Sequence, residues 1–207
     1  MELKELTPLI LELSAVILIF VFVLILHKHK NDRIGKSGEK EVKMILRNLP
    51  SHSYHVLNDI VIPTKYGHTQ IDHIVVSRYG IFVIETKNVM GLITGNTADE
   101  QWIKGSRKFK FRNPILQNDG HVRALIALLN ISSGDFFPIV VFNRRGELQI
   151  STSRKVIYND QLISEILLHK QVILDDKQVK QITADIKRNN VTSREIRRNL
   201  RKGRQPK

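Results

Sequence analysis

The sequence contains no cysteine, no long low-complexity tract, no internal repeat and no glycine-rich phosphate loop of the Walker type. The missing cysteine excludes a disulfide framework and thiolate metal sites, and no Ser-His-Asp order can be inferred. Acidic residues are also scarce, because 20 Asp and Glu stand against 33 Lys and Arg, which gives a formal net charge of +13. Such an excess favours a polyanionic partner, either nucleic acid or an anionic membrane surface. With 207 residues, 42% of them hydrophobic, the chain can form one core of ordinary size plus extensions.

A hydrophobic run lies close to the N-terminus. Residues 9–26 read LILELSAVILIFVFVLIL, in which Glu12 is the charged residue. As a helix the run would be roughly 27 Å long at about 1.5 Å per residue, close to the ~30 Å hydrocarbon core of a bilayer. We therefore expect a transmembrane helix at about residues 7–26, with residues 1–30 forming an anchor in the lipid bilayer and its basic flank.

The charges beside this run predict its orientation. The segment that follows, HKHKNDR, is basic, whereas the preceding MELKEL is not clearly so. By the positive-inside rule, the rest of the chain would lie in the cytoplasm as the C-terminal domain of a single-pass protein of the cell membrane. A cleaved signal peptide is one alternative, but no small-x-small cleavage site follows. A buried helix of a soluble protein is the other alternative.

Beyond a short linker at residues 31–36, the chain predicts one mixed α/β domain. A helix with apolar residues at helical spacing ends before Pro50, and residues 94–103 are expected to be irregular or to hold one short strand. Strands are expected at 54–62, 71–77, 81–87, 137–142 and 155–158. Further helices are expected at 115–129, 160–168 and 177–188. Residues 191–207 form a basic tail, which is either a solvated, frayed end or an electrostatic arm for nucleic acid or lipid headgroups.

Two acids and a lysine interrupt two otherwise apolar strands. The stretch QIDHIVVSRYGIFVIETKN has Asp72 near one end and Glu85 and Lys87 near the other. A two-residue turn through Arg78 and Tyr79 would place Asp72 opposite Glu85, and Lys87 would share their face because side chains alternate along a strand. A three-residue turn would shift the register by one and weaken this match. We expect the three side chains to cluster at one end of the hairpin.

Facing carboxylates repel each other, and a bound cation relieves the repulsion better than a lysine does. Carboxylate oxygens suit Mg²⁺, which commonly takes one or two protein carboxylates and completes its octahedron with water and phosphate oxygens. Such a metal acidifies a water and stabilises charge on a phosphodiester, and a nearby lysine can orient the water. An ordinary Glu–Lys ion pair at a strand end is the alternative.

Glu39 is a third acid that we expect near this cluster. It precedes Val42 and Leu46 by three and seven residues, so it lies on the inward stripe of the first helix of the domain. An acid in the first turn of a helix also complements the helix dipole. A purely structural role for Glu39 therefore stays open.

Several motifs occur in a fixed order along the chain. They are GKSGEKEV around Glu39, QIDHIVVSRYGIFVIETKN, NPILQ at residues 113–117 and FPIVVF at residues 137–142. Together they resemble the nuclease-related domain, called NERD, of the PD-(D/E)xK nuclease superfamily. The resemblance covers a core at residues 34–142 within a domain at residues 31–190. It implies a restriction-endonuclease-like fold, in which a mixed central sheet is flanked by helices.

The resemblance also implies roles for individual residues. Asp72 and Glu85 would be metal ligands, and Lys87 would be the catalytic lysine. Glu39 matches the helical acid of the family and would complete the metal site directly or through water. Gln117 matches a glutamine on the later helix, which would contact the site or the substrate.

A basic and aromatic segment precedes the helix expected at 115–129. Its basic residues are Lys104, Arg107, Lys108, Lys110 and Arg112. They surround Phe109 and Phe111, and such an arrangement can grip a phosphate backbone and stack on bases. A solvated loop with both phenylalanines turned inward is the alternative. His121 lies on the same helical face as Gln117 and could touch phosphate, with an ordinary surface histidine as the competing interpretation.

The sequence thus predicts a membrane-anchored, metal-dependent nuclease that hydrolyses phosphodiester bonds with Mg²⁺ or Mn²⁺, with DNA as the expected substrate. One alternative is a catalytically inactive nucleic-acid-binding or scaffold module at the cytoplasmic membrane face. Another is a membrane-surface adaptor that binds anionic lipid through the basic tail. The mutually repelling acids favour the enzyme, because binding alone does not need them.

Overall fold

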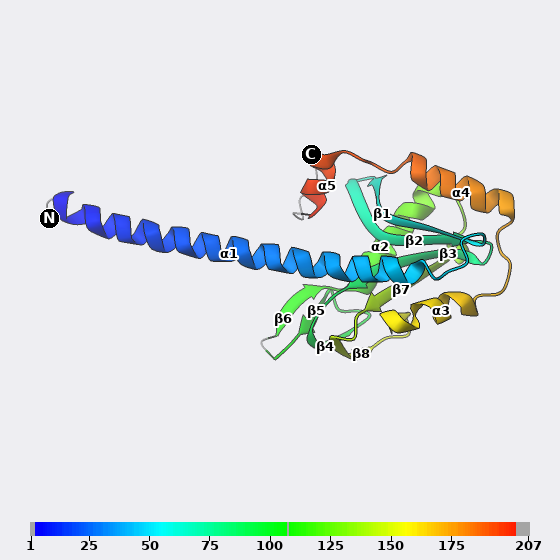
Figure 1. Cartoon of the computed structure of the whole chain (residues 1–207), viewed down its shortest axis with the longest axis horizontal. Helices are drawn as coiled ribbons and strands as arrows, with labels where there is room; N and C mark the ends of the chain where they lie inside the picture. Colours follow the sequence, from blue (N-terminus) through cyan, green and yellow to red (C-terminus); the bar gives the residue numbers. More distant parts are fainter. Residues whose placement is uncertain (1–2, 107, 202–207) are drawn as a thin grey trace. The chain divides into compact units, whose positions relative to one another are not determined.

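The computed structural model describes residues 3–106 and 108–201 (Figure 1). The chain divides into two compact units, one up to Ser37 and one from Gly38 onward. The first helix, α1 (Leu3–Leu46), contributes to both units. The linker expected at residues 31–36 is therefore wrong, since this segment is helical. The segment contains no proline, so nothing in it blocks the helical hydrogen bonds, although its Asn, Asp and Gly residues are weak helix formers.

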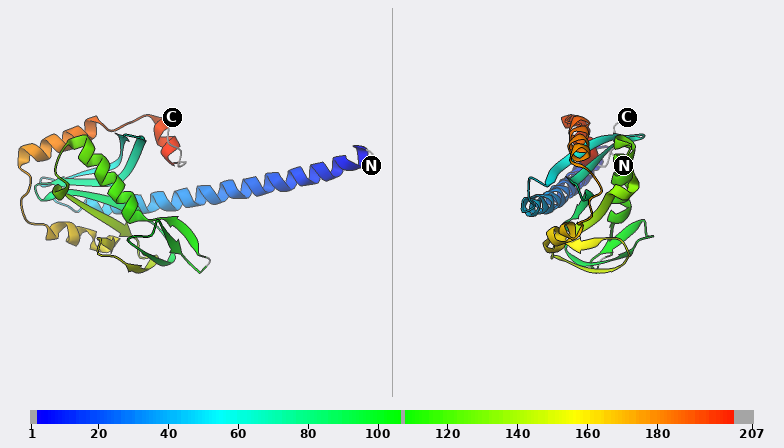
Figure 2. Two further views of the ribbon diagram at one scale, coloured as in Figure 1. Left: turned by 180° about the vertical axis from the view of Figure 1, so that it is seen from behind. Right: turned by 90° about the vertical axis from the view of Figure 1, so that its right-hand side faces the viewer.

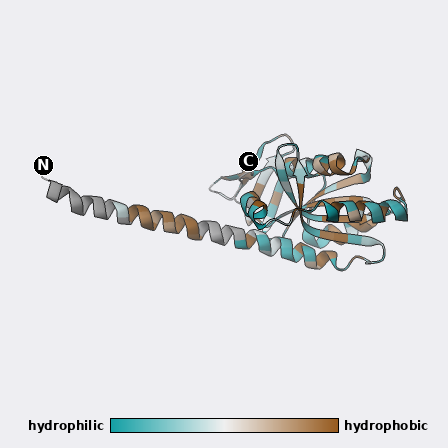
Figure 3. Ribbon diagram, turned by 90° about the horizontal axis from the view of Figure 1, so that it is seen from above, coloured by the Kyte–Doolittle hydropathy of each residue, from teal (hydrophilic) through white to brown (hydrophobic). Residues whose placement is uncertain are grey.

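The transmembrane helix expected at residues 7–26 is not supported by the structure. Among the described residues, no helix offers an apolar stretch long enough to cross a bilayer. The apolar side chains at residues 16–26 of α1 are exposed, and this part of the helix is coloured as hydrophobic in Figure 3. The predicted single-pass location in the cell membrane, and the bilayer contact that rested on it, are corrected accordingly.

The larger sheet has five strands in the order β1-β2-β3-β7-β9. They are β1 (Tyr54–Thr64), β2 (Gly67–Ser77), β3 (Gly80–Lys87), β7 (Phe136–Phe142) and β9 (Val156–Tyr158). The first three strands are antiparallel, whereas β3, β7 and β9 run parallel. The sheet is therefore mixed, and the expected α/β class with helices flanking a mixed sheet is confirmed.

Helices cover both faces of this sheet (Figure 2). Helices α2 (Pro114–Leu129) and α4 (Asp176–Arg188) pack on one face, in a core that includes Val83. The last turns of α1 and helix α3 (Leu162–Leu168) pack on the other face, around Phe82. Because neighbouring residues of a strand point to opposite faces, Glu85 shares the α2 face with Val83.

Strands β2 and β3 form the hairpin that positions the candidate site. Ile74 lies opposite Val83, and the turn consists of Arg78 and Tyr79 alone. This is the two-residue turn and the register that the sequence predicted. Gly80 follows the turn with a φ of 126°, which a residue with a side chain rarely adopts.

A second, smaller mixed sheet has the order β6-β5-β4-β8. Its strands are β4 (Gly91–Asn96), β5 (Gln101–Lys104), β6 (Phe109–Arg112) and β8 (Gly146–Ser151). The sequence predicted only an irregular segment or one short strand here, because glycines and polar residues dilute the apolar alternation. Trp102 is fully buried in this sheet, and a Cβ at Gly95 would lie 2.4 Å from its Cδ1. Glycine at position 95 therefore lets the indole pack against the backbone.

The last described residues pack beside β1. The Val61 amide donates to Asn190 Oδ1 over 3.0 Å, and the Val191 amide donates to the Val61 carbonyl over 2.7 Å. Helix α5 (Arg194–Arg201) follows, and Nη1 of Arg197 lies 2.9 Å from Oδ2 of Asp59. Part of the basic tail is thus helical and tied to the sheet. Two short 3-10 helices are η1 (Ser133–Asp135) and η2 (Asn159–Gln161).

Candidate active site

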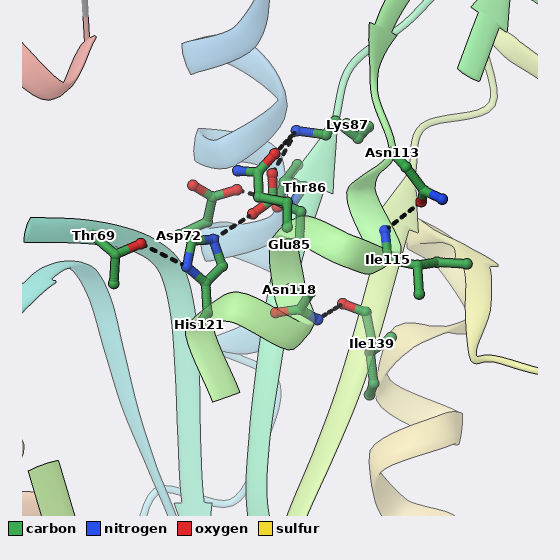
Figure 4. Close-up of polar contacts among 11 residues, drawn as sticks. Thr69, Asp72, Glu85, Thr86, Lys87, Asn113, Ile115, Asn118, His121 and Ile139 are labelled. Carbon is green, nitrogen blue, oxygen red and sulfur yellow. Dashed lines mark hydrogen bonds and ion pairs between the residues drawn. The ribbon is translucent and has the colours of Figure 1, made fainter. Parts of the chain in front are cut away.

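Asp72 and Glu85 lie at the end of the β2–β3 hairpin (Figure 4). The strand pairing includes His73 opposite Ile84, and Asp72 and Glu85 are the next residues in the same register. The Thr86 amide donates to Asp72 Oδ2 over 2.8 Å. This bond fixes the Asp72 carboxyl next to the strand that carries Glu85.

Glu85 is buried, with 2% of its surface exposed. Its Oε1 accepts a hydrogen bond from Lys87 Nζ over 2.5 Å, and its Oε2 lies 3.1 Å from His121 Nε2. An ionised carboxylate can only accept, so His121 carries a proton on Nε2 in this contact. Both oxygens of Glu85 therefore have a donor, as a buried carboxylate requires.

Lys87 joins Glu85 to helix α2. Its Nζ also donates to Gln117 Oε1 over 3.0 Å. Asn113 caps α2, because its Oδ1 accepts from the Ile115 amide while its Nδ2 donates to three backbone carbonyls of residues 96–99. The cap fixes where α2 begins and hence where Gln117 meets Lys87.

His121 lies one turn further along α2 and is buried. Its Nδ1 lies 2.9 Å from Thr69 Oγ1, so the ring bridges β2 and the Glu85 carboxylate on β3. The interpretation of His121 as an ordinary surface histidine is therefore wrong, because this side of α2 faces the sheet. The direct phosphate contact considered for His121 is likewise replaced by a contact with Glu85.

The environment of Asp72 opposes its ionisation. Burial raises the pKa of Asp72 well above its usual range, and the charges of Glu85 and Glu39 raise it further. The Thr86 amide and Lys87 act in the opposite direction without cancelling the effect. The raised pKa of Asp72 thus reflects burial and then repulsion by the other two carboxylates. A cation bound beside Asp72 would be strongly stabilised by this negative charge.

The environment of Glu85 has the opposite net effect. Burial acts to raise the pKa of Glu85, but Lys87 and the hydrogen bond from His121 outweigh it and leave this pKa below its usual range. The pKa values of the two acids are therefore shifted in opposite directions, although the residues lie on adjacent strands. Such divergence is frequent at functional sites.

Glu39 reaches this region because α1 approaches the end of β3 closely. A Cβ at Gly38 would lie 2.6 Å from Cβ of Asn88, the residue that follows Lys87. The absence of a side chain at Gly38 lets the two backbones approach each other. Glu39 is half-buried and its charge raises the pKa of Asp72, so it contributes to the acidic environment of that carboxyl.

The chemistry of these acids suits a hard cation. Asp72, Glu85 and Glu39 offer carboxylate oxygens, and their repulsion at Asp72 is of the kind that a divalent ion relieves. No group of three or more His, Cys, Asp or Glu side chains is arranged to hold a metal ion within the described parts of the chain. Mg²⁺ needs no such group, because it commonly uses one or two carboxylates and takes its other ligands from water and phosphate. The donor set therefore fits Mg²⁺ better than a metal that demands a protein cage.

The basic residues expected to contact nucleic acid belong to a different structural element, the β5–β6 hairpin. Lys104 lies in β5, Lys110 and Arg112 lie in β6, and Lys108 lies in the turn with a φ of 54°. Arg107 falls outside the described residues. In the described chain, none of the other four forms an ion pair with a carboxylate. The structure thus holds an acidic cluster and a separate basic hairpin.

Two buried polar contacts of the site were missing from the sequence prediction. Thr69 bonds to His121, and Asn118 Nδ2 donates to backbone carbonyls of both β3 and β7. The available signal was the run of polar residues Gln117, Asn118 and His121 on a helix expected to face the core. Such a run indicates a polar site beneath the helix.

A family model for the nuclease-related domain matches residues 34–143, which is more than half of the chain. The chain belongs to the nuclease-related domain (NERD) family. The resemblance read from the motifs is thereby confirmed. The match spans the segment from Glu39 to the strand β7 and includes the hairpin and α2, so the acidic cluster lies within the NERD domain.

The similarity to a known protein extends beyond the matched NERD domain. A protein of Bacillus anthracis, described as uncharacterized, is 36% identical over 171 residues, which cover 78% of this chain and 79% of that relative. No solved structure matches the chain.

Proposed function

We propose that this NERD protein is a metal-dependent phosphodiester hydrolase that cleaves nucleic acid, with DNA as the expected substrate. The observation that carries the proposal is the meeting of Asp72, Glu85 and Lys87 on one face of the β2–β3 hairpin, beneath α2. Repelling acids among apolar strands destabilise the fold, so a structural role alone does not explain them. The mixed sheet flanked by helices supports a restriction-endonuclease-like architecture as part of the same proposal.

Asp72 and Glu85 would hold a Mg²⁺ or Mn²⁺ ion, and Glu39 would complete the site directly or through water. The bound ion would supply a more acidic water and a positive charge facing the phosphodiester. The raised pKa of Asp72 supports this assignment, because its causes after burial are the neighbouring charges of Glu85 and Glu39. Cation binding would relieve that repulsion.

The remaining residues have roles that follow from their contacts. Lys87 is a cation held between Glu85 and Gln117, so it would orient the attacking water or stabilise negative charge that develops on the phosphate. Hydrolysis adds water across one P–O bond, and the leaving oxygen takes a proton. His121 would keep the Glu85 carboxylate in position.

The charge of the chain supports nucleic acid as the substrate. The formal net charge is +13, and phosphate backbones attract such an excess. The four described cations of the β5–β6 hairpin, Lys104, Lys108, Lys110 and Arg112, would contact the backbone near the site. Arg107 would join them on sequence grounds.

A catalytically silent nucleic-acid-binding module is the second candidate. One observation favours it: both oxygens of Glu85 already bond to Lys87 and His121. In an active enzyme, Glu85 would have to exchange or share one of these donors when the ion binds. A silent module would keep both contacts in every state.

Cleavage assays separate the two candidates. The full chain is incubated with labelled single-stranded DNA, duplex DNA and RNA, with Mg²⁺, with Mn²⁺ or with a chelator. We expect metal-dependent cleavage that Asp72→Asn reduces by about 10²-fold or more, since it removes a charge that faces the ion. Lys87→Ala should reduce turnover as well, while leaving metal binding largely intact.

Asp176→Asn is the matched control. It makes the same chemical change at an exposed acid that pairs with Arg78, beyond the opposite end of the hairpin, and should leave cleavage unchanged. Circular dichroism establishes that all variants fold. Binding without cleavage at any metal concentration, unaffected by Asp72→Asn, would identify the silent module instead.

A further inference from the structure

The structure points to a base-stacking platform on the β5–β6 hairpin. We propose that Phe109 stacks on an unpaired base and that the chain therefore selects nucleic acid with single-stranded segments over continuous duplex. This inference rests on the proposed function, because selection of single-stranded segments would choose the substrate of the proposed nuclease. Its physical basis is independent of catalysis, because it concerns only the hairpin.

The two phenylalanines of β6 have different surroundings. Phe111 lies opposite Trp102 in the strand pairing, and their rings meet edge to face at 6.3 Å. Phe109 lies two residues earlier and therefore on the same face of the strand, but it is 56% exposed. An aromatic row thus starts in the core at Trp102 and ends at a ring in solvent. The alternative in which both rings turn inward holds only for Phe111.

Leaving Phe109 in solvent has no benefit for folding. Burial of a phenylalanine side chain contributes about 1.5–3 kcal/mol of stability, which this position largely gives up. The ring is held by a strand and not by a disordered end, since Phe109 pairs with Lys104 across the hairpin. A fixed, exposed ring is the element that proteins use to stack on bases without hydrogen-bond readout.

The charges around Phe109 identify the class of partner. Residues 101–112 read QWIKGSRKFKFR and contain no acid. Lys104 lies opposite Phe109, and Lys108 and Lys110 flank it in sequence. Both flanking lysines are exposed. Lys104 shares the face of Phe109 because the two residues are paired, whereas Lys110 points to the other face of β6. An exposed ring beside a cation on a basic hairpin fits a ligand that offers a flat apolar surface and negative charge together, which describes a base on its phosphate backbone.

The hairpin is directly connected to the candidate active site. β6 ends one residue before Asn113, whose cap begins α2, and Gln117 on that helix contacts Lys87. The chain from Phe109 to Asn113 covers at most about 14 Å at ~3.4 Å per residue, and one helical turn of about 5.4 Å leads on to Gln117. At ~3.4 Å per stacked nucleotide, the ring lies within about six nucleotides of Gln117. One short strand could therefore contact both.

Unpaired substrate is favoured over duplex by the chemistry of the ring. In a duplex, each base already stacks on its neighbours, so an external ring gains nothing unless a base is displaced. An unpaired base offers its face freely, and stacking on an aromatic side chain then adds to phosphate attraction. Lysines alone would not distinguish the two forms in this way.

Binding measurements in a chelator test the platform without cleavage. The full chain is titrated by fluorescence anisotropy with a labelled 20-nucleotide thymidine strand and with a 20-base-pair duplex. We expect Phe109→Ala to weaken single-strand binding by roughly 5- to 100-fold and to change duplex binding by less than about two-fold. Phe109→Trp should retain single-strand affinity, because tryptophan also stacks.

Two controls make the test specific. Leu168→Ala shortens a side chain that is 70% exposed on α3 and should change neither affinity. Lys108→Gln with Lys110→Gln should weaken single strand and duplex alike and lower the slope of log affinity against log salt by about one per lost phosphate contact. Comparison of the double lysine variant with Phe109→Ala separates the contribution of positive charge from that of base stacking.

Fluorescence provides a direct readout of the stacking itself. Trp102 is the natural tryptophan and is fully buried, so the new indole of Phe109→Trp reports on the hairpin. Its emission should be quenched by the thymidine strand and unaffected by duplex. Equal losses for both ligands in Phe109→Ala, no loss at all, or no quenching would overturn the platform. Binding through Phe109 without metal-dependent cleavage would leave the platform standing and reject the proposed function.

Discussion

The Nε2 atom of His121 lies 3.1 Å from Oε2 of Glu85, and both residues are almost fully buried. The same ring contacts Thr69 through Nδ1, so neither ring nitrogen faces solvent. His121 is therefore a fixed support of Glu85 and is not positioned to touch a phosphate itself. In the proposed enzyme, His121 would hold Oε2 of Glu85 while Oε1 exchanges or shares its contact with Lys87 when the ion binds.

His121→Ala is expected to damage the site in two measurable ways. Loss of a donor to the buried Glu85 costs about 1–3 kcal/mol of unfolding free energy, which urea denaturation measures. Steady-state cleavage should show a lower kcat with KM nearly unchanged, because substrate affinity does not depend on this ring. His121→Gln, whose amide can donate toward Glu85, should recover part of the kcat. Wild-type kcat in both variants would exclude the positioning role.

Asp72→Asn is expected to stabilise the fold at neutral pH, although it removes activity. The pKa of Asp72 is raised mainly by burial and then by Glu85 and Glu39, so the folded state binds the proton more tightly than the unfolded state. Stability therefore falls as pH rises from the unfolded value of about 3.9 toward the folded pKa. At pH 7 the variant should melt at a higher temperature than the wild type, and the difference should disappear at low pH.

The same pair of proteins reports on the cation. Millimolar Mg²⁺ should raise the melting temperature of the wild type, because it offsets the repulsion at Asp72, and addition of a chelator should reverse the gain. Asp72→Asn should respond much less. A wild type that is more stable than the variant at pH 7, and indifferent to Mg²⁺, would contradict the account of the acidic cluster.

His73 should give the fold a loss of stability in mild acid. It is 2% exposed, its Nδ1 lies 2.8 Å from Asn58 Oδ1, and burial lowers the pKa of His73 to about 4, with Glu85 opposing and Lys43 adding to the shift. Between the unfolded value of 6.5 and about 4, the unfolded state binds more protons. Stability should therefore fall as pH drops through this window, by about 3 kcal/mol at ~1.4 kcal/mol per pKa unit.

Urea denaturation between pH 4 and 7 measures this loss. His73→Asn keeps a donor for Asn58 but cannot take up a proton in this range, so its stability should depend less steeply on pH. An equally steep dependence in the variant would assign the effect to other groups.

Gly38 and Gly35 form a matched pair on α1. Alanine favours a helix over glycine by about 1 kcal/mol, and a Cβ at Gly35 meets nothing within 4 Å. A Cβ at Gly38 would lie 2.6 Å from Cβ of Asn88. We expect Gly35→Ala to be neutral or stabilising, and Gly38→Ala to cost about 1–3 kcal/mol through overpacking and to lower cleavage by displacing Glu39. Thermal melts and the cleavage assay measure both effects, and identical behaviour of the two variants would show that the close approach is unimportant.

The hairpin that carries the acids was predictable because local chemistry fixes its register. A turn through Arg78 and Tyr79 aligns apolar residues on both strands, and this alignment places Asp72 opposite Glu85. The two-residue turn fixes the register, because the turn type and loop length of a hairpin set which residues face each other. The sequence therefore predicted the part of the candidate site that depends on strand pairing.

The support behind these residues depends on contacts between distant segments. Thr69 and His121 are separated by 52 positions, and helical periodicity alone does not say whether a polar stripe faces water or a polar site. The membrane anchor was predicted from the hydrophobicity of residues 9–26 alone, and no helix among the described residues is long and apolar enough to cross a bilayer.

Strand β1 is the outer member of its sheet, and residues 190 and 191 occupy hydrogen-bonding groups along its open side at Val61. An uncovered strand edge invites pairing with other copies of the same protein. A chain shortened before Asn190 would therefore become prone to self-association, even with every residue of the acidic cluster intact. Loss of cleavage after such a deletion would report aggregation rather than a missing catalytic group.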